Sequence, residues 1–236
     1  MRAGIMQPYY FPYAGYISLL KHVDIFVLFD VVQFIHHGWI ERNRILKPKE
    51  GWQYIQVPLV KHSRETKILD IKIRNTENWQ ERTFAQLVHY KKRAPHYAHV
   101  IELLKELYSH DYEDITSLNK AALEAVCRYL GINTPIVILS KSDIQYEEAE
   151  APGLWALNLC KSMEGIDEYW NLSGGIEYFD RDAYENNGIK LQFHKINLLP
   201  YNQRRGCFEP GLSILDMMMF LDKEELNQHL DTFDLL

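Results

Sequence analysis

The N-terminal segment alternates apolar and turn-forming stretches in a way that few folds accommodate. Ala3–Met6 and Asp24–Phe29 are short, mostly apolar runs, as strands buried on both faces are. Between them, Gln7–Tyr16 holds two prolines and a glycine, which predicts a tight loop, and Tyr16–His22 has helical spacing of apolar residues. Strand, loop, helix and strand form the opening unit of a parallel α/β sheet. We therefore expect the two strands to be adjacent and parallel.

The rest of the chain continues the α/β pattern around one helical stretch. Apolar residues at helical spacing fill about 77–131, which predicts an insertion of three helices. Further strands are predicted at 53–59, 68–73, 135–139, 167–172 and 189–193. Further helices are predicted at 153–163, from the glycines near 174 to Tyr184, and at 212–221, which is the last. We predict a Rossmann-like parallel sheet of the nucleotidyltransferase kind with a helical insertion, in a single domain over residues 1–236.

Composition limits the class of function. The formal net charge is −6, whereas bulk nucleic-acid binders are usually basic, so we expect no DNA partner. Three widely spaced cysteines fit neither a disulfide framework nor a zinc pattern, which favours a reducing cytoplasm and predicts no metal site. No run approaches the ~18 apolar residues of a membrane span, so none is expected.

The loop Gln7–Tyr16 is the first candidate site. In parallel sheets, ligands bind at the carboxyl ends of strands beside a helix N-terminus, which is where this loop falls. Its run Pro12-Tyr13-Ala14-Gly15-Tyr16 is comparable with the P-x-H-x-G-H loop of nucleotidyltransferases, with Tyr13 and Tyr16 at the histidine positions. Tyrosine donates a hydrogen bond but carries no positive charge at neutral pH. Gln7, Tyr13, Gly15 and Tyr16 are candidate substrate-binding residues; the alternative is a turn of packed aromatic side chains.

A second polar cluster follows the second predicted strand. Arg42 and Arg44 are suited to phosphate or carboxylate, and His36 or His37 to acid–base chemistry near neutral pH. Adjacent histidines point in different directions in most backbones, so at most one is expected to act. The alternative is an exposed basic loop.

Two further features are weaker candidates. Ser173-Gly174-Gly175 precedes a predicted helix, where backbone N–H groups could hold an anion, although glycine turns are common. Asp216 follows Ser213 by three residues, a spacing that also occurs in simple helix caps.

Taken together, these segments resemble the WbqC-like family over essentially the whole chain. The stretches that carry the resemblance are Met6–Tyr16, Gly38–Ile40 with Arg42–Ile45, Gln56–Leu59, Leu130–Ile132, Gly174–Gly175 with Tyr178, and Phe208–Asp216. The resemblance implies a bacterial protein encoded among surface-polysaccharide and O-antigen genes. For some members, transfer of glycine or another aminoacyl group to a sugar has been suggested.

The residues and the resemblance together predict a transferase that acts on a nucleotide-linked sugar or uses an activated amino acid. Arg42 and Arg44 would hold phosphate or carboxylate, His36 or His37 would be the general base, and Asn43 would orient the substrate. The sequence indicates no particular cofactor. The alternative is a non-catalytic nucleotide- or sugar-binding protein that keeps the fold without the histidines of the nucleotidyltransferase loop.

Overall fold

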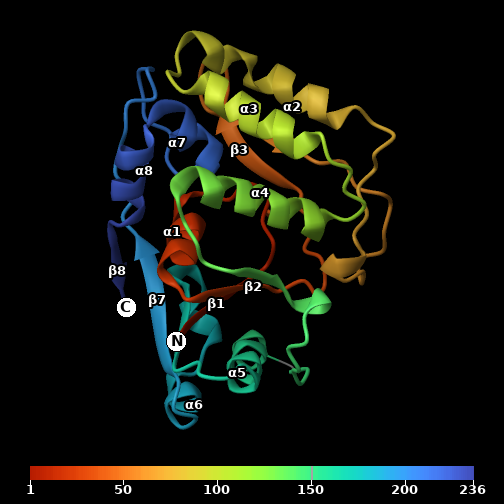
Figure 1. The fold of residues 1–236 in the computed structure, drawn as a ribbon, viewed down its shortest axis with the longest axis vertical. Helices are drawn as coiled ribbons and strands as arrows, with labels where there is room; N and C mark the ends of the chain where they lie inside the picture. Colours follow the sequence, from red (N-terminus) through yellow and green to blue (C-terminus); the bar gives the residue numbers. More distant parts are fainter. Residues whose placement is uncertain (150) are drawn as a thin grey trace.

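A six-stranded sheet runs through the middle of the molecule, with helices on both faces (Figure 1). The structure is a computed structural model that describes residues 1–149 and 151–236. Its strand order is β5-β2-β1-β6-β7-β8, and β8 alone is antiparallel to its neighbour. The strands are β1 Arg2–Met6, β2 Ile25–Leu28, β5 Ile136–Ile138, β6 Glu168–Leu172, β7 Lys190–Ile196 and β8 Phe233–Leu235. The fold is therefore α/β and Rossmann-like, as predicted.

The opening unit forms as the sequence indicates. β1 and β2 are parallel, in a register that pairs Ala3 with Ile25 and Met6 with Leu28, and α1 (Ala14–His22) connects them. The prediction of adjacent parallel strands is confirmed. β1 has β2 on one side and β6 on the other, so the strand order reverses between β1 and β6. Open α/β sheets bind ligands at such a switch point, outside the carboxyl ends of the strands.

Side chains alternate between the two faces of the sheet because successive residues of a strand point in opposite directions. Ala3 and Ile5 pack toward α5 (Pro152–Ser162) and α6 (Arg181–Glu185). Phe26 and Leu28 pack toward the other face, which α1, α4 (Ile115–Leu130) and α8 (Lys223–Leu230) cover. Fully burying one such large apolar side chain contributes about 1.5–3 kcal/mol.

A second layer lies beyond α4 and carries a two-stranded antiparallel hairpin. The hairpin strands are β3 (Arg42–Leu46) and β4 (Trp52–Gln56). They pack with α2 (Trp79–Leu87), η2 (Val88–Lys92), α3 (Tyr97–Tyr108) and α7 (Ile214–Phe220), at the top of Figure 1. The helices expected at about 77–131 are thus present, and α4 contacts both α3 and the main-sheet strand β5.

Three local predictions differ from the structure. Residues 68–73 contain a 3₁₀ turn, η1 (Ile68–Asp70), because the N–H of Ile71 bonds back to the carbonyl of Ile68. The predicted helix between the glycines and Tyr184 is two elements, η4 (Ser173–Tyr178) and α6, since the Asp180 side chain caps a new helix start. The 212–221 helix is not the last element, because α8 and β8 follow it. A further 3₁₀ turn, η3, spans Leu139–Lys141.

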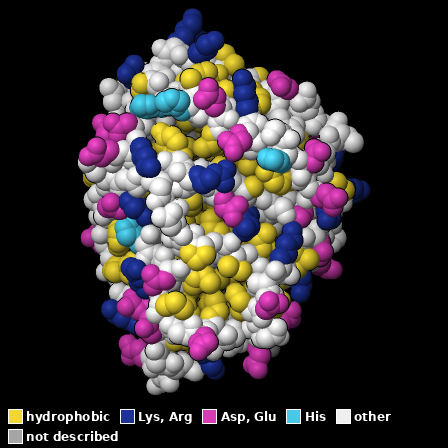
Figure 2. All heavy atoms as spheres, in the orientation of Figure 1, with side chains coloured by type: hydrophobic (Ala, Val, Ile, Leu, Met, Phe, Trp, Pro, Cys, Tyr) yellow, Lys and Arg dark blue, Asp and Glu magenta, His cyan; other side chains and the backbone are white. Residues whose placement is uncertain are grey.

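The surface mixes charges of both signs. On the face in Figure 2, acidic and basic side chains alternate around apolar ones that gather in the lower half of the view. No helix in the described part of the chain is long and apolar enough to cross a membrane.

Candidate functional site

A pocket of about 630 Å³ opens at the switch point of the sheet. Its walls come from the loop after β1, from β3 and the residues before it, from the end of β6 with the start of η4, and from two loop residues that precede α7. This volume is in the range of small-molecule sites. The lining residues are Met6, Tyr9, Pro12, Tyr13, Trp39, Asn43, Arg44, Asn171, Leu172, Gly174, Gly175, Leu198 and Gly211. The structure thus brings together Tyr13, Asn43, Arg44, Gly174 and Gly175, which were predicted from separate segments.

Arg44 supplies the positive charge of the pocket. Its guanidinium lies between two indoles, 5.3 Å from the ring centre of Trp39 and 5.2 Å from that of Trp52, and its Nη2 donates to the Gly211 carbonyl at 2.9 Å. The Nε atom is buried and has no hydrogen-bond partner. Within residues 1–149 and 151–236, no carboxylate forms an ion pair with Arg44. A cation held in this way is suited to an anionic ligand group.

Asn43 fixes the position of β3 against the loop after β1. The side chain is buried, its Nδ2 donates to the Tyr10 carbonyl at 3.1 Å, and its Oδ1 accepts from the Arg44 backbone N–H at 2.8 Å. The backbone N–H of Tyr10 donates in turn to the carbonyl of Trp39. Both ends of the Asn43 amide are therefore engaged with backbone, and its role toward a substrate stays a prediction.

Tyr13 and Gly15 form one packing unit at the start of α1. Tyr13 is the N-cap residue, and its ring folds over the first turn of the helix. A Cβ atom at Gly15 would lie 2.5 Å from the Cζ of Tyr13, so only glycine leaves room for the ring. Burial raises the pKa of Tyr9 and of Tyr13, so both phenols stay neutral and can donate hydrogen bonds in the pocket.

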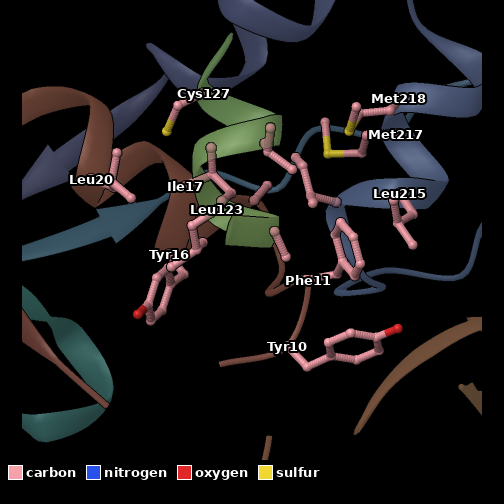
Figure 3. Close-up of a cluster of buried hydrophobic side chains, with 14 of the residues drawn as sticks. Tyr10, Phe11, Tyr16, Ile17, Leu20, Leu123, Cys127, Leu215, Met217 and Met218 are labelled. Atoms are coloured by element: carbon pink, nitrogen blue, oxygen red, sulfur yellow. The ribbon is translucent and has the colours of Figure 1, made fainter. Parts of the chain in front are cut away.

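Tyr16 lies in the core and does not line the pocket. Its ring is fully buried against Tyr9 and Phe26, and Figure 3 shows it among the core side chains of α1 and α4. Its hydroxyl donates to the Gln7 carbonyl at 2.8 Å, which holds the start of the loop. Gln7 is not a lining residue either. The geometry gives both residues a structural place beneath the site.

His36, His37 and Arg42 also lie outside the pocket lining. Both histidines are exposed, and the ring of His36 stacks on that of His62 with centres 5.0 Å apart. The Nη2 of Arg42 donates to the His37 carbonyl at 2.6 Å, and the guanidinium lies over the ring of Tyr54. Arg42 thus stabilises the turn before β3. The base role of the histidines stays a prediction, and neither ring lines the pocket.

Asp216 is buried at the start of α7, away from the pocket lining. Its carboxylate accepts hydrogen bonds from the hydroxyls of Tyr90 (2.6 Å) and Tyr201 (2.5 Å) and from the Gln203 amide (2.9 Å). Burial raises its pKa to about 6 in spite of these three donors. Asp216 therefore joins η2, the loop before α7 and α7 itself.

The sequence reasoning missed several lining residues. Tyr9, Trp39, Asn171, Leu198 and Gly211 line the pocket, and Trp52 packs on Arg44 from the hairpin. The available signals were the density of aromatic residues in the proline-containing loop and the position of Asn171 at the carboxyl end of a predicted strand. Leu198 and Gly211 lie in a long loop whose path the sequence does not indicate.

The fold defines an α/β protein with a pocket at the switch point of a doubly wound sheet. The model of the WbqC-like protein family matches residues 7–228, and the chain belongs to that family. An uncharacterized protein of Mycobacterium tuberculosis, Rv1507c, is 30% identical over 226 residues, which cover 94% of this chain and 95% of that protein. No solved structure gives a significant match.

Proposed function

We propose that the protein is a cytoplasmic transferase of bacterial surface-polysaccharide (O-antigen) biosynthesis that modifies a nucleotide-linked sugar. Glycine or another aminoacyl group is the candidate for the group transferred. The observation that carries the proposal is the guanidinium of Arg44, held between two tryptophans in the switch-point pocket without a carboxylate partner in the described chain.

The pocket walls support a substrate that joins an anionic group to a ring. Arg44 would bind phosphate or carboxylate through its free donors. Tyr9, Tyr13 and Trp39 offer aromatic faces on which a base or sugar ring can stack. No atom outside the adjacent residues lies within 4 Å of the place where Gly174 would carry a Cβ, so a ligand can approach the backbone there.

An aminoacyl transfer places simple demands on this site. The hydroxyl or amine of the acceptor bonds to the carbonyl carbon, the bond from that carbon to its activating group breaks, and the proton of the acceptor passes to the leaving group or to solvent. Arg44 and the neutral phenol of Tyr13 would stabilise negative charge on the leaving group or on the carbonyl oxygen. Positioning and charge stabilisation, rather than proton abstraction by a histidine, would then supply the rate enhancement.

A second candidate is a non-catalytic binding protein for a nucleotide or sugar ligand. The observation in its favour is that Arg44, Tyr9 and Tyr13 are the titratable side chains among the described lining residues, so the pocket wall holds no histidine or carboxylate to serve as a general base. In this case ligand binding would be kept and turnover would be absent.

A thermal-shift panel of nucleotides, nucleotide sugars and aminoacyl donors tests the binding step. A ligand at 100 times its dissociation constant stabilises the folded state by ~2.7 kcal/mol. We expect at least one nucleotide sugar to raise the melting temperature of the wild-type protein, and Arg44→Ala to remove that shift. A panel without any shift, or a shift that Arg44→Ala leaves unchanged, contradicts the proposal.

Product analysis then separates the two candidates. Each ligand that binds is incubated with activated glycine and other aminoacyl donors, and the sugar product is analysed by mass spectrometry. A mass increase that depends on the protein supports the transferase, whereas binding without product for every donor favours the binding protein.

A further inference from the structure

A second cavity, of about 490 Å³, lies at the turn of the hairpin. It forms where three distant segments meet: the β3–β4 turn at 49–51, Arg93 after η2, and the loop at 204–209. This loop connects β7 to α7 and lies at the same end of the molecule as the start of α3 (Figure 1). The two pockets share no lining residue.

Four cations line this cavity, Lys49, Arg93, Arg204 and Arg205, against two carboxylates, Glu50 and Glu209. Among the residues that the structure describes, none of the four takes part in an ion pair. Their local excess of positive charge contrasts with the net charge of −6 of the chain. Unpaired cations gathered in one concave site attract anions more strongly than scattered surface charges do.

The cavity is held in shape by hydrogen bonds of its own wall. Arg205 is half-buried, and its Nη1 and Nη2 donate to the carbonyls of Gly51 (3.2 Å) and Lys49 (3.1 Å), which ties the loop to the hairpin turn. Arg204 has a φ of 49°, a left-handed conformation that side chains other than glycine rarely adopt. Its backbone N–H donates to the Asn202 side chain at 2.9 Å, which fixes that conformation. Strained backbone of this kind concentrates at ligand sites.

The positive field of the cluster reaches nearby buried groups. Burial lowers the pKa of His89, and Arg93 and Arg205 lower it further. Arg205 also favours the charged form of Asp216. Arg93 and Arg205 therefore act on the same region, whereas Lys49, Arg93 and Arg204 all have exposed side chains.

We propose that this cavity is a second anion site, which takes a diphosphate group. Two linked phosphates carry two or more charges within a few ångströms, which matches a cluster of several cations better than a single carboxylate does, and planar guanidinium forks are suited to phosphate oxygens. The positive residues line a concave cavity and do not form a stripe along a face, which fits a small ligand rather than a nucleic-acid strand. The site is independent of the proposed transferase function.

Cys207 provides a reporter within the wall. It is the exposed cysteine of the chain, while Cys127 and Cys160 are buried. In the native protein, the dianionic disulfide reagent 5,5′-dithiobis(2-nitrobenzoate) should therefore modify Cys207 rapidly and the other two slowly. Inorganic pyrophosphate bound in the cavity should slow this reaction, and a Cys207→Ser protein should show no fast phase.

The binding test uses calorimetry at low salt with inorganic pyrophosphate and, separately, inorganic phosphate. We expect pyrophosphate to bind roughly ten- to a hundredfold more tightly than phosphate, because one further hydrogen bond between charged groups contributes about that much affinity. Arg93→Gln should weaken pyrophosphate binding by at least roughly tenfold. Arg204→Gly should weaken it as well, and this variant relieves the strained φ, so a loss of binding cannot be ascribed to misfolding.

Two control variants make the outcome decisive. Lys190→Ala removes one exposed charge far from the cavity and should bind pyrophosphate as the wild type does. Arg44→Ala removes the cation of the switch-point pocket and should keep the pyrophosphate binding that protects Cys207. The inference is wrong if Arg93→Gln behaves like Lys190→Ala, or if pyrophosphate does not protect Cys207. It is equally wrong if Arg44→Ala abolishes binding, because the ligand then occupies the switch-point pocket.

Discussion

Arg44 and Gly211, far apart in sequence, are joined by a hydrogen bond of 2.9 Å from Nη2 to the carbonyl oxygen. The backbone of the same region is joined too, because the Ser213 N–H donates to the Arg44 carbonyl at 2.8 Å and the Ser213 hydroxyl to the Phe11 carbonyl at 2.7 Å. The loop after β1, strand β3 and the loop before α7 therefore meet at one junction. The pocket is built on this junction, so the position of its cation is fixed before a ligand arrives.

The first prediction concerns the geometry of that cation. Arg44→Lys keeps the charge but loses the fork that can bond Gly211 and a ligand at the same time. We expect ligand affinity between those of wild type and Arg44→Ala, with Arg44→Ala weaker than wild type by roughly ten- to a hundredfold. Titration calorimetry with the ligand found in the thermal-shift panel measures all three.

Arg42 is the matched control for Arg44, two residues away on the same strand. Because Arg42 bonds the carbonyls of His37 and Gly38 and stacks on Tyr54, Arg42→Ala should lower the melting temperature and leave the affinity of the folded protein unchanged. Equal loss of affinity in the Arg42 and Arg44 variants would show that the pocket does not single out Arg44.

The second prediction concerns Gly15. A Cβ at this position displaces the Tyr13 ring, which is only partly buried and can swing away, so Gly15→Ala should cost little stability. The displaced ring no longer forms the pocket wall, and ligand binding should fall markedly. Tyr13→Ala has no ring to displace, so adding Gly15→Ala to it should produce little further loss. Additive losses in the double variant would rule out this coupling.

The main sheet was predictable because its strands are buried on both faces and read as apolar runs. Ala3–Met6 and Asp24–Phe29 were found for that reason, and their parallel pairing followed from the short helix between them. β3 was missed because Arg42-Asn43-Arg44 reads as a polar loop. In the structure the alternation is nevertheless that of a strand, with Asn43 and Ile45 buried and the two arginines on the opposite side against aromatic rings of β4.

The candidate site was predictable in part, for a similar reason. A loop after β1 and a glycine turn after β6 lie at strand ends, and the fold brings strand ends together. The density of polar residues did not distinguish Arg44, which lines the pocket, from three residues that do not. These are His36, His37 and Arg42, which belong to the turn before β3 and its first residue. That distinction depends on the hairpin and on Gly211, which approaches from the far end of the chain.

The third prediction uses Asp216, whose folded-state pKa of about 6 lies above its usual value because the carboxylate is buried. Between about pH 4 and 6 the folded protein binds this proton more tightly than the unfolded chain does, so stability from this group is lost as the pH rises through that window. The loss is on the order of 3 kcal/mol. Asp216→Asn cannot ionise, and its free energy of unfolding should fall less than that of the wild type from pH 4 to pH 7 in urea titrations. Parallel curves for the two proteins would exclude a raised pKa.

The fourth prediction uses His194, whose contribution to stability changes with pH in the opposite direction to that of Asp216. The Ser18 hydroxyl donates to the Leu230 carbonyl at 2.5 Å, so the contact of 2.9 Å between Ser18 and the Nε2 of His194 requires the histidine to donate. Its Nδ1 is then an unprotonated nitrogen, buried and without a partner. Burial, with His22 nearby, lowers the pKa of His194 to about 4. Protonation would place an unbonded N–H and a charge inside the core.

For such a group the unfolded chain binds more protons between about pH 4 and 6.5, so stability is lost as the pH falls through that window. The stability lost on acidification because of His194 is again on the order of 3 kcal/mol. In the wild type this loss partly offsets the stability that Asp216 contributes as the pH falls. His194→Gln keeps an N–H donor for Ser18 and cannot be protonated. It should be less stable than the wild type at pH 7 but should lose less stability on acidification to pH 4. The double variant with Asp216→Asn should change with pH about as the wild type does, because the two contributions have opposite signs and similar size. If His194→Gln loses as much stability as the wild type between pH 7 and pH 4, burial does not keep His194 neutral in the folded protein.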